Sequence, residues 1–276
     1  MITNHEQYFI QIIGDASLMV ERFTLQLYLY DKDKPPIPAS SAVLIKTYSN
    51  RYLITAAHVF IDNPRDSIFI LDPGSGGITV AGECIISEIH KNEVSNRTDI
   101  AIIQLNEALF PVIDKLKKDY FDITTYNLDY YNKNELYIVY GYPNSKTKLL
   151  KGKKKIQTTP FKFLTKQTTH PIKEVDKPWT IQVRFTRNKI SRLNTNEINN
   201  APRPVGLSGC GIWDYESILY QKEDGPVLRL KAILIEYIDN RSILICTKMN
   251  MITQLLINRF NEQLQPPESL ANYNII

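Results

Sequence analysis

Three short segments of the chain carry residue types that can perform nucleophilic catalysis. The first places His58 after an apolar stretch ending in two alanines, in residues 53–60 (LITAAHVF). The second places Asp99 before the apolar residues 100–105 (IAIIQL), and the third places Ser208 between glycines in residues 204–213 (PVGLSGCGIW). Each has an ordinary alternative: a core or surface histidine, a turn aspartate, and a glycine-rich turn before a strand.

The combination of the three residues predicts a hydrolytic triad. A serine hydroxyl is a weak nucleophile and needs a base to accept its proton. An imidazole suits that role near neutral pH, and a carboxylate behind it fixes the tautomer and stabilises the imidazolium. Glycines around Ser208 permit backbone shapes that direct successive N–H groups toward one point.

Two series of short strands are predicted to position these residues. The first has strand patterns at 24–30, 41–46, 52–55, 67–71, 78–86 and 100–105, and the second at 136–140, 162–168, 179–185, 211–213, 228–237 and 242–247. We interpret 31–38, with its three prolines, as a loop, and 4–22 as a short helix followed by a turn at Gly14-Asp15. Apolar residues at helical spacing predict an amphipathic helix over 249–265, which Pro266 ends.

These elements predict one all-β unit over residues 1–276. We expect a first barrel at 23–113, a linker at 114–134, a second barrel at 135–248 and a C-terminal α-helix at 249–265. Since His58 and Asp99 fall in the first strand series and Ser208 in the second, the site is expected between the two barrels.

Composition excludes several classes of protein. The chain has 276 residues, 43% of them hydrophobic and 22% charged, which is typical of a folded globular protein. No apolar run is long enough to span a membrane, and residues 1–13 do not resemble a secretory signal, so we expect a cytoplasmic protein. The three cysteines are expected to be reduced; none has zinc-ligand spacing, and we expect neither a metal nor a cofactor.

A cluster of lysines lies between Lys146 and Lys155. We interpret it as a solvated loop rather than a nucleic-acid site, because the net charge is only +4 and no nucleic-acid motif accompanies it. If the cluster were a nucleic-acid site, the protein would bind DNA or RNA with an affinity that falls as salt rises.

The segments L-I-T-A-A-H, T-D-I-A-I-I-Q-L and G-L-S-G-C-G resemble the three signature regions of trypsin/chymotrypsin-like serine peptidases, in the bacterial type of the domain. The resemblance extends from about Thr24 to the terminal helix. It implies two six-stranded antiparallel β-barrels packed face to face with catalysis in the cleft between them. It also implies Ser208 as nucleophile, His58 as general base and then acid, Asp99 as orienting carboxylate, and the N–H groups of Gly206 and Ser208 as oxyanion hole.

The third segment departs from the usual G-D-S-G-G of the family in two places. Leu207 replaces the aspartate that pairs with a freshly cleaved N-terminus in secreted members, so we expect no activation by that route. Cys210 replaces a glycine, and we interpret it as a packing residue rather than the nucleophile.

The resemblance also locates a primary specificity pocket. One wall is expected at Ala201, Pro202 and Arg203, and the other at Ile235, Glu236 and Tyr237. No acidic residue stands at the position of the pocket floor, so a preference for Lys or Arg is not expected. Arg203 would favour an acidic side chain if it faced the pocket rather than solvent.

The sequence therefore predicts a serine endopeptidase acting on a protein or peptide substrate, possessing no membrane anchor, and serving as a regulated protease in bacterial stress or antiviral defence. The alternative is a binding module of the same fold whose triad is latent until an activating protein partner completes it. Leu207 motivates this alternative, because the usual ordering salt bridge is missing there.

Overall fold

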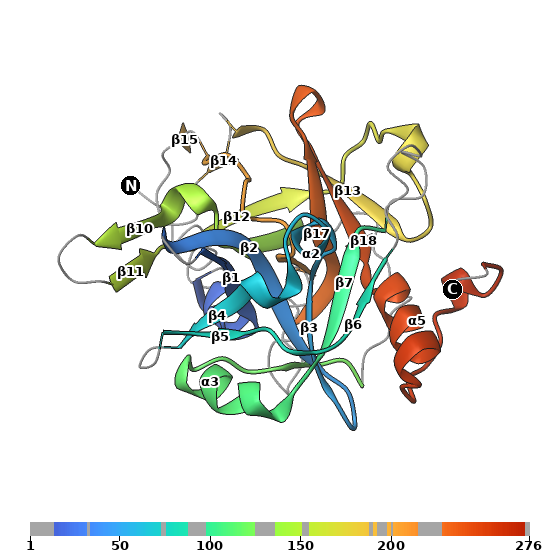
Figure 1. Cartoon of the computed structure of the whole chain (residues 1–276). Coiled ribbons are helices and arrows are strands. Elements are labelled where there is room, and N and C mark those ends of the chain that lie inside the picture. Colours follow the sequence, from blue (N-terminus) through green and yellow to red (C-terminus); the bar gives the residue numbers. More distant parts are fainter. Residues whose placement is uncertain are drawn as a thin grey trace.

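The computed structural model shows a mostly β molecule with two curled antiparallel sheets and a C-terminal helix (Figure 1). The structure describes residues 14–31, 34–72, 76–87, 98–124, 136–150, 155–187, 190–191, 198–199, 201–214 and 228–273. The predicted fold class is confirmed in these terms, although the sheets are half-barrels rather than fully closed barrels.

The first sheet contains the elements that carry His58 and Asp99. Its path is β5-β4-β1-β2-β3-β7-β6, and β8 pairs with β2 in parallel outside this path. The two ends of the path are consecutive in the chain, with only Val80 and Ala81 between them, which curls the sheet toward closure. The strands are β1 (Thr24–Asp31), β2 (Lys34–Lys46), β3 (Arg51–Ala56), β4 (Ile68–Asp72), β5 (Gly76–Thr79), β6 (Gly82–Ile86), β7 (Ile100–Leu105) and β8 (Phe121–Asp122).

The second sheet carries Ser208 in the loop that leads into one of its central strands. Its order is β12-β9-β16-β17-β18-β13, and a bridge between Gln167 and Val183 brings the first and last strands together. The strands are β9 (Leu136–Gly141), β12 (Phe161–Lys166), β13 (Thr180–Arg184), β16 (Gly211–Asp214), β17 (Arg229–Ile238) and β18 (Ile243–Lys248). Two hairpins lie outside both sheets, formed by β10 (Thr147–Leu150) with β11 (Lys155–Thr158) and by β14 (Ile190–Ser191) with β15 (Ile198–Asn199).

The central strands β3 and β7, and β2 from Ser40 to Ile45, are buried on both faces, which explains their nearly continuous apolar sequences. Side chains alternate across a strand, so Ala42 and Leu44 of β2 enter the core of the first barrel while Val43 and Ile45 face the second. The core between the barrels also includes Trp213 and residues of the terminal helix. This packing fixes the two sheets against each other and defines the edge where the triad residues lie.

The C-terminal helix α5 (Met249–Phe260) packs against β17 and β18. The prediction that it extends to residue 265 is wrong. Asn261 adopts a left-handed conformation at φ +54° and its N–H bonds the carbonyl of Leu256, which is a common way for a helix to end.

Two other local predictions are wrong. Residues 34–38 belong to β2 rather than to a loop; its prolines are tolerated because this end of β2 pairs with β1 alone, where a missing N–H leaves no ladder bond unmade. Residues 14–22 form a helix, so there is no turn at Gly14-Asp15, and residues 4–13 lie outside the described residues.

The segment predicted as a lysine-rich loop contains the strands β10 and β11. Part of the predicted linker is also ordered, since the helix α3 (Phe110–Lys115) and strand β8 fall within or beside it. Each of the two strands has only four residues, too few for an alternating pattern to mark it, which is why the sequence did not reveal the hairpin.

Candidate active site

The pairing of β3 with β7 brings His58 and Asp99 to the same edge of the first sheet. Ala56, the last residue of β3, lies opposite Ile100, the first residue of β7. Because the strands are antiparallel, the residue after one end and the residue before the other become neighbours. The N–H of Ala57 accordingly donates to the carbonyl of Asp99 at 3.0 Å, and His58 then opens the short helix α2 (His58–Ile61).

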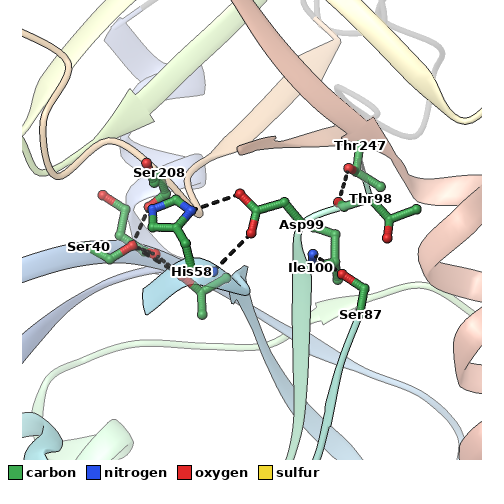
Figure 2. Close-up of polar contacts among 10 residues, drawn as sticks. Ser40, His58, Ser87, Thr98, Asp99, Ile100, Ser208 and Thr247 are labelled. Atoms are coloured by element: carbon green, nitrogen blue, oxygen red, sulfur yellow. Dashed lines mark hydrogen bonds and ion pairs between the residues drawn. The ribbon is translucent and has the colours of Figure 1, made fainter. Parts of the chain in front are cut away.

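Both carboxylate oxygens of Asp99 contact His58 (Figure 2). The backbone N–H of His58 donates to Oδ1 at 2.9 Å, and Nδ1 lies 2.8 Å from Oδ2. A carboxylate only accepts hydrogen bonds when ionised, so this contact places the ring proton on Nδ1. Nε2 is left with a free lone pair that can accept a proton.

The backbone around Asp99 is held on both sides in a conformation that few residues adopt. Asp99 has φ +37°, in the left-handed region where Asp is among the tolerated residues. The hydroxyl of Thr247 donates to the carbonyl of Thr98 at 2.5 Å, and the N–H of Ile100 donates to the hydroxyl of Ser87 at 2.8 Å (Figure 2). These contacts from β18 and from the end of β6 fix the direction of the carboxylate.

The surroundings of His58 raise its pKa above the usual value. Burial lowers the pKa, but the hydrogen bond and the negative charge of Asp99 raise it, and the charges of Asp62 and Glu236 add to that effect. The imidazole is therefore a stronger base than a free histidine.

Glycines are required on both sides of Ser208. Gly206 has φ +91°, and a Cβ there would lie 2.1 Å from Oδ1 of Asn144. Gly209 has φ +83°, and a Cβ there would lie 2.0 Å from the carbonyl oxygen of Ser41. These contacts show how closely the loop of the second barrel approaches β2 of the first.

Every carbonyl from Val205 to Ser208 accepts a hydrogen bond. The carbonyl of Val205 accepts from the N–H of Asn144 at 2.9 Å, and that of Gly206 accepts from the hydroxyl of Ser41 at 2.9 Å. The carbonyl of Leu207 accepts from the N–H of Cys210 at 3.0 Å, and that of Ser208 accepts from the N–H of Ser41 at 2.9 Å. The hydroxyl of Ser40 donates to the last of these carbonyls as well (Figure 2). Four consecutive peptide groups are thereby fixed in orientation.

The N–H groups of the same loop divide into two sets. Those of Leu207 and Gly209 donate to the carbonyls of Pro204 at 2.9 Å and Leu234 at 2.7 Å. Those of Gly206 and Ser208 donate to no acceptor among the residues that the structure describes. Since a trans peptide holds N–H opposite to C=O, the bonded carbonyls of Val205 and Leu207 fix the directions of these two free N–H groups. Two fixed, unpaired N–H groups beside a serine hydroxyl are what an oxyanion hole requires.

Figure 2 shows the imidazole of His58 between Ser208 and the carboxylate of Asp99. Within the described residues, no hydrogen bond joins Ser208 to His58. Bonds between nucleophile and base are often long without substrate and shorten when it binds. The chain thus brings the three predicted residues to one place, with the His58 to Asp99 contact formed and the Ser208 to His58 contact unformed.

Cys210 does not compete with Ser208 as a nucleophile. Its side chain is fully buried in the second barrel, and burial raises the pKa of the thiol well above its usual range. A buried, protonated thiol is inert.

The residues predicted for the specificity pocket fall into two groups. Ala201 and Ile235 are buried, Ala201 in the core of the second barrel and Ile235 in the core between the barrels, and their assignment as pocket walls stays a prediction. Pro202, Glu236 and Tyr237 are half-buried and Arg203 is exposed. Small and branched apolar residues next to a site serve packing as readily as binding, so the sequence could not separate the two groups.

Four polar residues that position the site were missed in the sequence: Ser40, Ser41, Asn144 and Thr247. One signal was available for the first two. Two adjacent serines interrupt the apolar strand that ends in AVLI, and buried hydroxyls need partners.

Comparisons with known proteins do not assign the chain to a class. No protein-family model and no curated protein matches it. A chain from a solved structure described as "Aromatic interactions drive the coupled folding and binding of the intrinsically disordered Sesbania mosaic virus VPg protein" aligns over 86% of this chain and 95% of its own length. It has 12% sequence identity to this chain and a TM-score of 0.43.

Metal-binding groups and membrane-spanning helices are both absent from the described residues. None of their His, Cys, Asp and Glu side chains form a group of three or more that could hold a metal ion. Across the same residues, no helix has both the length and the apolar character needed to cross a membrane.

Proposed function

We propose that this chain is a serine endopeptidase in which Ser208, His58 and Asp99 form the triad. One observation carries the proposal: within the described residues, the N–H groups of Gly206 and Ser208 donate to no acceptor, whereas those of Leu207 and Gly209 do. Fixed donors of this kind stabilise the oxyanion of a tetrahedral intermediate. The His58 to Asp99 contact supplies the base that such a serine needs.

In the proposed reaction, the Ser208 hydroxyl oxygen attacks the carbonyl carbon of a peptide bond while Nε2 of His58 takes its proton. The negative oxygen of the tetrahedral intermediate accepts hydrogen bonds from the N–H groups of Gly206 and Ser208. His58 then gives the proton to the departing amine, leaving an acyl-enzyme. Water, deprotonated by His58, attacks that ester, and Ser208 recovers its proton as the carboxylic acid leaves.

The proposed substrate is a protein or peptide. Pro202, Arg203, Glu236 and Tyr237 stay in the proposal as specificity residues, because their side chains retain access to solvent. A role in a bacterial stress or antiviral pathway remains a prediction from the sequence resemblance.

The test is digestion of a proteome-derived peptide library, with the products identified by mass spectrometry. Wild type should cleave peptides, and Ser208→Ala should reduce turnover by up to about a millionfold. Ser49→Ala, which changes an exposed serine in the turn after β2, is the matched control and should cleave like wild type. Undiminished cleavage by Ser208→Ala would overturn the proposal.

A second candidate function is a binding module whose triad is latent. The unformed hydrogen bond between Ser208 and His58 favours a latent triad, because binding of a partner could bring the two side chains into contact. Cleavage of library peptides by the purified chain alone would exclude this candidate.

A further inference from the structure

Ser41 links three segments through one buried residue. Its side chain is fully buried on β2, and its hydroxyl donates to the carbonyl of Gly206 at 2.9 Å and accepts from the N–H of Tyr142 at 2.9 Å. Its own N–H donates to the carbonyl of Ser208 at 2.9 Å. The hydroxyl has a single proton to donate, and here that proton is committed to the loop that carries the proposed nucleophile.

The two backbone groups bonded by this hydroxyl have no other partner among the described residues. β9 ends at Gly141, so the N–H of Tyr142 lies beyond the sheet ladder, and no second donor reaches the carbonyl of Gly206. Both groups are in buried residues. Loss of the hydroxyl would therefore leave a donor and an acceptor unsatisfied, and the loop would gain by moving to expose or re-pair them.

The peptide group fixed by Ser41 lies between the two that present the free N–H groups. Its carbonyl is that of Gly206 and its N–H, from Leu207, bonds Pro204. The central peptide joins the two that present the free N–H groups, so its rotation would strain the bonds that hold the carbonyls of Val205 and Leu207 and would loosen the alignment of the two N–H groups. Gly206 allows such a rotation readily, because glycine has access to many backbone conformations.

Among the described residues, no charged group performs this task at the centre of the loop. Leu207 is fully buried in the core of the second barrel, where it packs beside Cys210. Its apolar contacts anchor the side chain, but they do not set the direction of the neighbouring carbonyl, which the Ser41 hydroxyl does.

From these contacts we infer that Ser41 is a positioning residue that keeps the oxyanion hole assembled in the free protein. The hole then needs neither a cut N-terminus nor a partner to form. This inference rests on the proposed function, because the hole matters only if Ser208 is acylated or phosphonylated.

The test measures the rate of Ser208 labelling by a fluorophosphonate probe as a function of pH. In that reaction the serine oxygen bonds phosphorus, fluoride leaves, and the phosphonyl oxygen occupies the hole. Ser41→Ala should label about tenfold to a hundredfold more slowly than wild type, less than complete loss of one donor costs in well-studied enzymes. Its pH midpoint should not change, because His58 and Asp99 keep their contacts. Ser41→Thr, which retains the hydroxyl, should label near the wild-type rate.

The matched control is Thr24→Val, which removes another fully buried hydroxyl that donates to a carbonyl, that of Val20, in the same barrel. It should label like wild type. Equal slowing in this control, a wild-type rate for Ser41→Ala, or a shifted pH midpoint in Ser41→Ala would overturn the inference.

Hydrogen exchange of the wild type, without any partner, provides a measurement that needs no variant. The inference predicts slow exchange at the N–H groups of Leu207, Gly209 and Cys210, which donate hydrogen bonds, and exchange there as fast as in an unstructured peptide would contradict it. Protection without any labelling of Ser208 would overturn the proposed function while leaving the loop geometry intact, so the two failures can be told apart.

Discussion

Replacing Asp99 with asparagine isolates the effect of its charge from its shape. One oxygen of Asp99 accepts from the backbone N–H of His58 and the other contacts Nδ1. A backbone N–H can only donate, so the asparagine oxygen must stay there and its NH2 group must face the ring. Nδ1 then loses its proton, and Nε2 carries one instead. The ring cannot accept the proton of Ser208 in that tautomer.

The expected loss for Asp99→Asn is about ten-thousandfold in the labelling rate with a fluorophosphonate, by analogy with the same substitution in another triad enzyme. That factor corresponds to about 5 kcal/mol of transition-state stabilisation. In wild type, labelling should rise with pH as His58 loses its proton, with a midpoint above the usual histidine pKa, because its pKa is raised.

The control is Asp62→Asn, because Asp62 is exposed and raises the pKa of His58 through its charge alone. Removing a negative charge lowers the pKa of a nearby histidine, so the midpoint should move to lower pH while the plateau rate stays unchanged. Labelling of Asp99→Asn within tenfold of wild type would refute the role assigned to Asp99.

Three further substitutions test the packing of the chain by urea unfolding. Gly209→Ala should destabilise the protein by at least about 1–3 kcal/mol, since φ is +83° and the new Cβ would lie 2.0 Å from a carbonyl oxygen. The control is Gly14→Ala, whose new Cβ meets nothing within 4 Å and should leave the stability unchanged. Equal losses of stability in the two variants would contradict the geometry at Gly209. Glu262→Ala should lower the free energy of unfolding by about 1–3 kcal/mol, because the donors of Asn50 and Tyr52 lose their acceptor. The control is Gln265→Ala, at an exposed residue. Equal stability of the two variants would contradict a stabilising role for these hydrogen bonds. Leu207→Asp should cost about 3–5 kcal/mol and slow labelling, since it buries a carboxylate in an apolar core; unchanged stability would show that the loop is not anchored there.

The strand pattern could be predicted because it depends on local signals, whereas the contact of His58 with Asp99 was expected from the combination of residue types and from the family resemblance. Apolar runs bounded by turn residues mark the strands, and the antiparallel pairing of β3 with β7 then brings the residues at their ends together. The glycines around Ser208 also stood out in the sequence, and the structure shows that the backbone at Gly206 and Gly209 leaves no room for a Cβ.

The features that the sequence did not reveal depend on contacts between distant segments. Ser41 and Asn144 matter through bonds to carbonyls of the Ser208 loop, and nothing near them in the chain indicates those partners. The prolines of β2 were misread because only the sheet order shows that this end of the strand has a single neighbour. Likewise, the sequence did not show that Ala201 and Ile235 are buried while Arg203 is exposed.

The site of covalent attachment tests the proposed chemistry most directly. Wild type is treated with a fluorophosphonate, digested, and examined by tandem mass spectrometry. The phosphonyl group should be found on Ser208 and nowhere else in the peptide that contains Cys210, and it should be absent from His58→Ala. An unmodified Ser208 under conditions that label a known serine hydrolase, or attachment to another residue, would contradict the assignment of this chain as a serine peptidase.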